Sequence, residues 1–203
     1  MEARIEHSIE TPGSSPNGLA WDGKHIWAVD ASKEVYRLDP EDGKLLARFD
    51  GQGYSGLEWY DGHLLNSDHR TRTIYKLDPE DGKIVDRFPA AGDVCSGIAW
   101  DGRYLWNGDH HEGIAQIDPQ EHKIVTFFEV PGERTHGLAF DGSHLWFADA
   151  DALEFYKVDL AGFAVVASLK CPEGTEPHGL TWDGQNLWYS DASSNILYRL
   201  RME

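Results

Sequence analysis

The chain has 203 residues, a hydrophobic fraction of 40% and a formal net charge of −17 at pH 7. This length allows one domain with its own core, and no hydrophobic stretch reaches the roughly 18 residues that a membrane-spanning helix needs. Because so acidic a surface repels a phosphate backbone, we expect neither a nucleic-acid partner nor a membrane partner.

Cysteine usage and the first residues bear on the compartment. The only two cysteines, Cys95 and Cys171, lie in different parts of the chain, which argues against a disulfide-dependent secreted scaffold. The N-terminal residues lack the apolar core of a signal peptide, although a leader trimmed from the sequence would leave the same chain. We expect a cytoplasmic monomer.

A five-fold repeat runs through the whole sequence. Each copy begins with a glycine and reaches an aspartate 12 residues later, as from Gly18 to Asp30. The leading glycines are Gly18, Gly56, Gly97, Gly137 and Gly179. A period of about 40 residues with fixed internal spacing is typical of a repeat architecture.

Each repeat predicts four short strands, which in the first copy are residues 18–21, 26–29, 35–38 and 45–49. They are rich in β-branched and aromatic residues and are bounded by Gly, Pro and Asp, as antiparallel strands are. The Asp-Gly dipeptide after the first strand suits a tight hairpin turn. Four strands in about 40 residues indicate one blade of a β-propeller.

The two ends of the chain predict how the ring closes. The fifth repeat stops after its third strand, whereas residues 3–9 form a spare strand before the first repeat. Ile9 precedes Gly18 by the same distance as Phe88 precedes Gly97. We therefore predict an all-β protein: one closed five-bladed propeller of four-stranded antiparallel blades over residues 1–203, with strand 3–9 completing blade five and leaving no long free edge.

Aromatic residues recur at two positions of the repeat and are expected to pack between blades. On the first strands these are Trp21, Trp59, Trp100, Phe140 and Trp182, and on the second strands Trp27, Trp106, Trp146 and Trp188. Leu65 takes the place of the second-strand tryptophan in the second repeat.

The residue in front of each repeat glycine is predicted to lie at the mouth of the central channel. The loops on that face differ between repeats, and variable loops on a rigid scaffold are the usual place for a site. These residues are Asn17, Ser55, Ser96, His136 and His178. A second ring consists of the aspartates that end the second strands, Asp30, Asp68, Asp109, Asp149 and Asp191, two of which are followed by His69 and His110.

Two interpretations of the aspartates stay open. One aspartate per repeat at a constant position is typical of a structural role, in which the carboxylate accepts N–H bonds from the loop that it opens. Alternatively, some of them line the channel and hold a ligand. In that case the candidate ligand-binding residues are Asn17, Ser55, Ser96, Asp30, Asp68, His69, Asp109, His110 and Asp191.

His136 and His178 break the five-fold pattern, because the other repeats carry Asn or Ser there. With Asp149 they would form a His/His/carboxylate set suited to a divalent metal ion, or an acid–base pair. The alternative is two polar rim residues that bond to neighbouring loops.

Glu58 is the other anomaly, since the residues at the equivalent positions are small. A buried carboxyl there would have a raised pKa suited to proton transfer. Arg70, Arg72 or Lys76 would neutralise it instead. The catalytic candidates are His136, His178 and Glu58.

Three motifs carry a family resemblance: Gly-Leu-Ala-Trp-Asp-Gly, Leu-Trp-x-x-Asp, and Ile-Tyr-x-Leu-Asp-Pro-x-Asp-Gly-Lys. The chain resembles the propeller class that contains the glutamine cyclotransferase, virginiamycin B lyase and NHL-repeat families. The five-bladed members convert N-terminal glutamine to pyroglutamate, and the Gln or Glu that they carry before Gly-Leu is Asn, Ser or His here. The lyase family uses a rim histidine and a magnesium ion, so this resemblance implies similar parts for His136 and His178. NHL-type propellers are commonly binding modules.

These observations leave two main functional hypotheses. The first is binding of a small molecule or metal ion at the channel mouth, with a lyase or a glutaminyl-cyclotransferase-like activity and a divalent ion as cofactor. The alternative is a non-catalytic module that binds a peptide, sugar or protein partner through Tyr54, His69, His110 and His111. The near-identical segments 38–44 and 77–83 also fit a repeat scaffold with no site at all.

Overall fold

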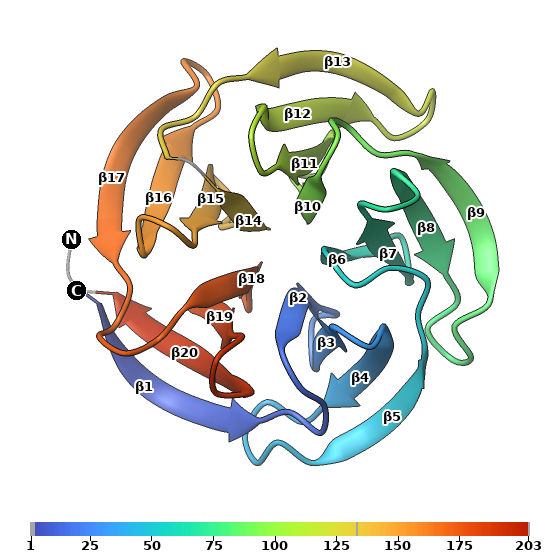
Figure 1. The fold of residues 1–203 in the computed structure, drawn as a ribbon, viewed down its shortest axis with the longest axis vertical. Coiled ribbons are helices and arrows are strands. Elements are labelled where there is room, and N and C mark those ends of the chain that lie inside the picture. The colour runs from blue at the N-terminus through green and yellow to red at the C-terminus, as the bar shows by residue number, and fades with distance from the viewer. Residues whose placement is uncertain (1–2, 133, 203) are drawn as a thin grey trace.

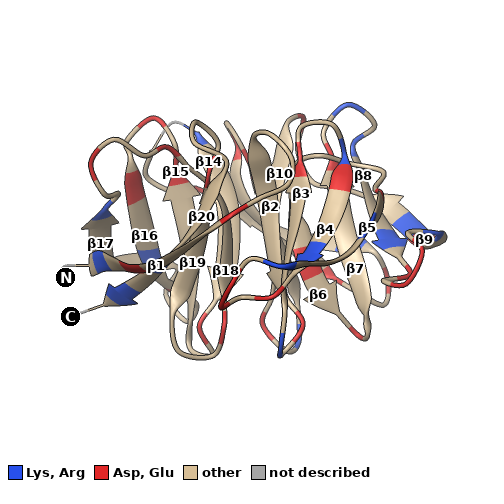
Figure 2. Cartoon of the chain, turned by 90° about the horizontal axis from the view of Figure 1, so that it is seen from below, with Lys and Arg blue, Asp and Glu red and all other residues tan. Residues whose placement is uncertain are grey.

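The computed structural model describes residues 3–132 and 134–202. Five four-stranded antiparallel sheets stand around a central axis like the blades of a propeller (Figure 1). Figure 2, turned by 90°, shows acidic residues mainly in the loops and turns at the two faces. Within the described ranges, no helix is long and apolar enough to cross a membrane.

The blades follow one another in chain order, and each runs from the axis outwards. Blade one contains β2 (Pro16–Trp21), β3 (Ile26–Asp30), β4 (Glu34–Leu38) and β5 (Leu45–Asp50); blade two contains β6 (Leu57–Tyr60), β7 (His63–Asp68), β8 (Thr73–Leu77) and β9 (Ile84–Pro89); blade three contains β10 (Cys95–Trp100), β11 (Leu105–Asp109), β12 (Gly113–Asp118) and β13 (Lys123–Phe128). Blade four contains β14 (Thr135–Phe140), β15 (His144–Asp149), β16 (Glu154–Asp159) and β17 (Ala164–Lys170); blade five contains β18 (Pro177–Trp182), β19 (Leu187–Asp191), β20 (Ile196–Met202) and β1 (Ala3–Glu10).

The N-terminal strand closes the ring. β1 lies antiparallel to β20, with Ile5 opposite Leu200 and Ile9 opposite Leu197. The order of blade five is therefore β18-β19-β20-β1, so both ends of the chain belong to one sheet. The predicted all-β, five-bladed ring with an N-terminal closing strand is confirmed.

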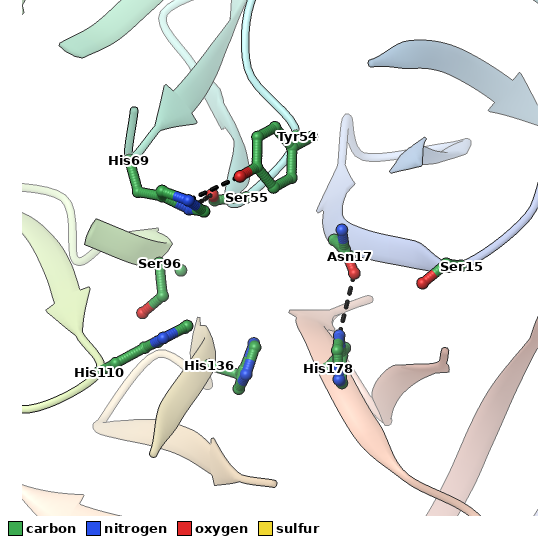
Figure 3. A pocket seen from close by; sticks show the side chains of 10 residues that line it. Ser15, Asn17, Tyr54, Ser55, His69, Ser96, His110, His136 and His178 are labelled. Carbon is green, nitrogen blue, oxygen red and sulfur yellow. Dashed lines mark hydrogen bonds between the residues drawn. The ribbon is translucent and has the colours of Figure 1, made fainter. Parts of the chain in front are cut away.

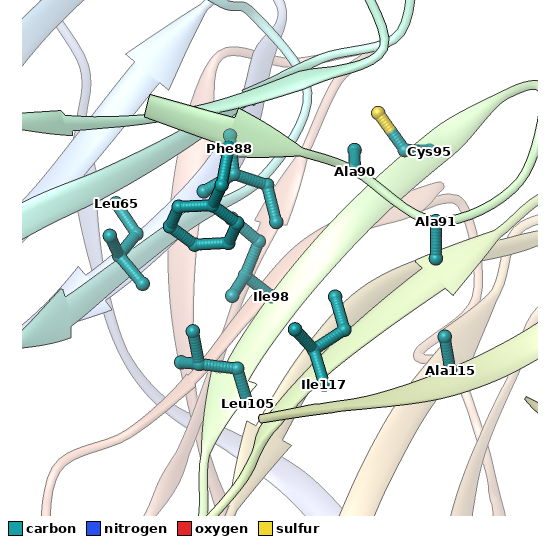
Figure 4. Close-up of a cluster of buried hydrophobic side chains, with 10 residues drawn as sticks. Leu65, Phe88, Ala90, Ala91, Cys95, Ile98, Leu105, Ala115 and Ile117 are labelled. Atoms are coloured by element: carbon teal, nitrogen blue, oxygen red, sulfur yellow. The ribbon is translucent and has the colours of Figure 1, made fainter. Parts of the chain in front are cut away.

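The core consists of apolar clusters between neighbouring blades. Between blades two and three, Leu65 and Phe88 pack against Ile98, Leu105 and Ile117, all at most 6% exposed (Figure 4). The second-strand tryptophans are buried as predicted, whereas the first-strand aromatics are half-buried.

Each second-strand tryptophan has a fixed polar partner. The indole N–H of Trp27 donates to Asp22 of the Asp-Gly turn at 2.9 Å, and the pair recurs as Trp106–Asp101, Trp146–Asp141 and Trp188–Asp183. In blade two both partners differ, because Tyr60 replaces the turn aspartate and Leu65 the tryptophan. The turn aspartate of blade two is instead Asp61, one position later, and its exposed carboxylate pairs with Lys76 at 3.6 Å. The odd leucine thus belongs to a coupled replacement of both members of the indole–carboxylate pair.

The repeat glycines are explained by the approach of the innermost strands. A Cβ added to Gly97 or Gly137 would lie 2.4 Å from the carbonyl oxygen of His136 or His178 in the next blade. At every glycine of the ring, an added Cβ would lie 2.4–2.8 Å from a carbonyl oxygen of the next blade. The ring consists of Gly18, Gly56, Gly97, Gly137 and Gly179. Only glycine allows this contact. The space that the glycines and the following residues enclose has a cavity volume of about 0 Å³, so the channel is shut at this level.

Candidate functional site

A cavity of about 260 Å³ lies at the channel mouth, on the side of the glycine ring where each β-strand nearest the axis begins (Figure 3). Its lining comprises Ser15, Asn17, Tyr54, Ser55, His69, Ser96, Gly97, His110, His136 and His178. All five residues that precede the repeat glycines are therefore brought together, along with His69 and His110. The sequence-based candidates lack Ser15 and Gly97, and they include Tyr54 only in the binding-module alternative.

β-Bulges aim several of these side chains. The register of β10 on β11 shifts between Cys95 and Ile98, and that of β14 on β15 shifts between Thr135 and Leu138. An extra residue at a bulge turns a side chain out of the regular alternation, as bulges beside active sites do. Ser96 and His136 sit at these irregular points and reach the cavity for that reason.

Three histidines from three blades stack along one wall. His136 lies between His110 and His178, with ring centroids 4.4 Å and 4.2 Å apart (Figure 3). Burial lowers the pKa of His136 to about 2 and that of His110 to about 4, and it also lowers the pKa of His178. The three rings are therefore uncharged at pH 7. The His178 ring is stacked on His136 at 24°, and the His110 ring is tilted against it at 44°.

His178 is tied to its surroundings at both ring nitrogens. Its Nδ1 lies 2.9 Å from Oδ1 of Asn17, and its Nε2 lies 3.3 Å from Oε1 of Glu176. The same Glu176 oxygen accepts a bond from Arg134 at 3.0 Å, and Arg134 also pairs with Asp151 at 3.0 Å. Arg134 is thus paired with both of the carboxylates nearest the stack.

The opposite wall belongs to blade two. Oη of Tyr54 lies 2.6 Å from Nε2 of His69, and Oγ of Ser55 lies 3.4 Å from Nδ1 of the same ring. The Tyr54 and His69 rings meet edge to face, with centroids 4.9 Å apart. Burial raises the pKa of Tyr54, so the phenol keeps its proton at pH 7.

Two polar groups of the lining lack a hydrogen-bond partner in the described structure. They are the Oγ of Ser96, whose residue is 2% exposed, and the Nε2 of His136. Buried polar atoms without a partner are rare. The Ser96 Oγ faces β11, 2.8 Å from where a Cβ of Gly108 would lie. Among the residues that the structure describes, no Asp, Glu, Lys or Arg belongs to the lining.

The five aspartates that end the second strands stabilise the loops that follow them. The carboxylates of Asp30, Asp109 and Asp149 accept bonds at 2.8–3.0 Å from backbone N–H groups of the loops that follow them. Asp68 and Asp191 do so at 3.1 Å, and all five are at most 2% exposed. This is the structural interpretation of the pattern. Asp30, Asp68, Asp109 and Asp191 do not line the cavity, and a ligand-binding role for them stays a prediction.

A three-ligand metal centre is not assembled from these residues. In the parts of the chain that are described, no group of three or more His, Cys, Asp or Glu side chains is arranged to hold an ion. His136 and His178 stack nearly parallel, at 24°, and the Asp149 carboxylate is taken by its own loop. The set His136, His178 and Asp149 thus does not fit a divalent ion in this arrangement, and metal binding stays a prediction.

Glu58 lies away from the cavity. Its carboxylate accepts the backbone N–H of Trp59 at 2.9 Å and a backbone bond from Trp100 of blade three, so it sits between blades two and three. Burial raises its pKa to about 8. Arg72 and Lys76 pair with Asp93 and Asp61 instead of with Glu58. Glu58, the candidate proton donor, is therefore not in the lining.

No protein-family model matches the sequence, and no curated protein matches it. Among solved structures, the glutaminyl cyclase of Myxococcus xanthus has a TM-score of 0.82 at 12% identity, over 98% of this chain and 96% of that one. Virginiamycin B lyase of Staphylococcus aureus has a TM-score of 0.60 at 21% identity, over 95% of this chain and 68% of that one. A β-propeller domain from Myceliophteria thermophila has a TM-score of 0.63 at 11% identity, over 99% and 100%. At these identities the likeness shows the fold.

Proposed function

We propose that the protein binds a small uncharged organic molecule in the cavity at the channel mouth. The observation that carries the proposal is the convergence of His69, His110, His136 and His178, from four blades, on a cavity that is shut beneath. Concave sites with a few convergent polar groups are the usual ligand sites of proteins.

The charge distribution favours an uncharged ligand. The described part of the lining holds no charged side chain, and the three histidines that lie in contact are neutral at pH 7. The nearest ions are paired, Arg134 with Asp151 and Glu176, and Lys33 with Asp68 at 2.9 Å. A charged ligand would lose its hydration without gaining a counter-ion. Only a compact molecule, or one end of a peptide, fits a cavity of about 260 Å³.

The enzymatic form of the proposal is a lyase or a glutaminyl-cyclotransferase-like activity. The support is the propeller likeness to a glutaminyl cyclase and to a lyase. A neutral imidazole can accept a proton from a bound substrate, and His136 and His178 are both neutral. The alternative of a surface binding module loses support because Tyr54, His69 and His110 line the cavity, which leaves His111 as the exposed member of that set.

A thermal-shift screen with uncharged fragments tests the proposal. A ligand at one hundred times its Kd stabilises a protein by about 2.7 kcal/mol, which is a rise in Tm of roughly 5–10 °C for a chain of this size. The double variant His136→Ala/His178→Ala should lose the shift, whereas His63→Ala, at the start of β7 on the other face, should keep it. Absence of any stabilising fragment, or a shift that survives in the double variant, would contradict binding at this site.

A further inference from the structure

We propose that blade two carries an acyl-transfer site in this cavity, with Ser55 as the nucleophile, His69 as its general base and Tyr54 as the residue that positions His69. The inference rests on the proposed function, because the substrate, a small uncharged ester or amide, must enter the same cavity. It assigns a reaction class and a covalent intermediate that the binding proposal does not contain.

The geometry has the form of a nucleophile, a base and a group that orients the base. Ser55 Oγ lies 3.4 Å from Nδ1 of His69, and Tyr54 Oη lies 2.6 Å from the other ring nitrogen. This is the arrangement by which a serine hydroxyl is activated on unrelated folds. The Ser55–His69 distance is at the long end, as such bonds often are before substrate binds.

The positions of the protons follow from one assignment. If Nε2–H of His69 donates to Oη of Tyr54, the lone pair of Nδ1 faces Ser55 and accepts its hydroxyl proton. The edge-to-face contact between the Tyr54 and His69 rings holds the imidazole in this orientation. Tyr54 therefore sets both the tautomer and the direction of the base, which is the role of the third member in such a set.

Hydrogen bonds to Ser67 fix the backbone at Ser55 and Gly56. The Ser55 N–H donates to the carbonyl of Ser67 at 3.2 Å, and the Gly56 N–H donates to the hydroxyl of Ser67 at 2.7 Å. That hydroxyl donates in turn to the carbonyl of Ser96 in blade three at 2.7 Å. A buried network of this kind fixes the position of the nucleophile, which a precise reaction geometry requires.

Blade three provides an internal comparison. Ser96 and His110 occupy the positions equivalent to Ser55 and His69, but Cys95 stands in the place of Tyr54. There the serine hydroxyl has no partner among the described residues, and burial lowers the pKa of the histidine to about 4. A serine and a histidine at these repeat positions thus do not pair by themselves. The pair forms in the blade that also has the tyrosine.

The proposed reaction has two balanced steps. Ser55 Oγ attacks the carbonyl carbon of the substrate while its proton passes to Nδ1 of His69, and the C–O or C–N bond then breaks as the leaving alcohol or amine takes that proton. Water next attacks the acyl-serine and gives a proton to His69. Ser55 Oγ regains this proton as the carboxylic acid leaves.

Labelling with phenylmethylsulfonyl fluoride tests the proposal, because this uncharged probe forms an O–S bond with an activated serine and releases fluoride. We expect one adduct, mapped to Ser55 by tandem mass spectrometry. It should be absent in Ser55→Ala and should form at least about 100-fold more slowly in His69→Asn. The exposed turn variant Ser143→Ala should react like the parent protein, and thermal unfolding should show that every variant is folded.

Tyr54→Phe separates positioning from a merely structural role. It keeps the ring packing but removes the partner of Nε2, so the midpoint of the pH–rate profile of labelling should shift and the rate should fall about 10-fold. No adduct, or one on Ser96 or Tyr54, would overturn the assignment. If uncharged fragments still stabilise the protein through His136 and His178 while Ser55 stays unlabelled, only the acyl-transfer proposal fails and the binding proposal stands.

Discussion

His136 is the residue whose environment differs most from that of its counterparts in the repeat. Two imidazole rings cover it, its Nε2 is buried without a partner among the described residues, and its pKa falls to about 2. The sequence predicted its place at the channel mouth, because the repeat glycine next to it marks the innermost strand. Sequence could not predict the stack, since it depends on bulges in strands from different blades.

The histidine stack predicts a loss of stability in acid. The unfolded chain binds protons at these histidines below about pH 6.5, whereas the folded state keeps His136 neutral down to pH about 2 and His110 down to about 4. Unfolding is therefore favoured as pH falls, by an amount on the order of 3 kcal/mol for His136 at pH 4. His136→Asn, which copies the residue of blade one, should flatten the fall in urea-unfolding free energy between pH 6.5 and 4. An unchanged slope would show that His136 is protonated in the folded protein.

Glu58 predicts the opposite trend. Its pKa of about 8 in the folded state means that it keeps a proton which the unfolded chain releases above pH about 4.5. Stability should therefore fall as pH rises from about 4.5 to 8, by an amount on the order of 4 kcal/mol. Glu58→Gln keeps the shape without the charge, so urea titrations at pH 5 and pH 8 should then differ much less than in the parent protein. If the variant retains the full difference, another group is responsible.

At the scale of the element, the innermost strands pack so closely that they leave no room for a side chain at the repeat glycines. Gly137 has no room for a Cβ, because the carbonyl oxygen of His178 would lie 2.4 Å away. Gly137→Ala should therefore cost about 3 kcal/mol or more, as overpacking of a fixed contact does. Gly162→Ala is the matched control, since its Cβ would meet only Asp159 at 3.6 Å and should change little. Urea unfolding of both variants checks this, and equal stabilities would contradict a backbone-limited ring.

The strands were predictable because their signals are local and repeated five times. The period, the Asp-Gly turns and the alternation of residues each depend on a few neighbouring positions. Glu58 and the aspartates show what such local signals did not predict, namely the direction in which a side chain points. A carboxylate on the innermost strand can face the channel or the next blade, and the choice depends on which face of β6 meets β10. Sequence named Tyr54 only as part of a contact surface and did not predict its bond to His69, because that contact joins two loops of one blade.

At the scale of the whole molecule, one segment closes the ring. β1 pairs with β20 along its length, Ile9 is 5% exposed in the core, and His7 bonds to the carbonyl of Pro40 in blade one at 3.1 Å. Removing residues 1–10 should leave the edge of β20 free and lower Tm. A free edge of this kind pairs with other chains, so the truncated protein should also associate in light scattering after gel filtration. A truncated protein that remains monomeric with its full Tm would contradict this account of closure.

Because the glycine ring is shut, the cavity opens at the channel mouth and does not continue along the axis past the ring. Whatever enters from the variable face must leave the same way, so nothing passes along the axis from one face to the other. If the site performs chemistry, the departing product and the arriving substrate share that opening. Each turnover then begins only once the previous product has gone, and added product should compete with substrate for the same opening.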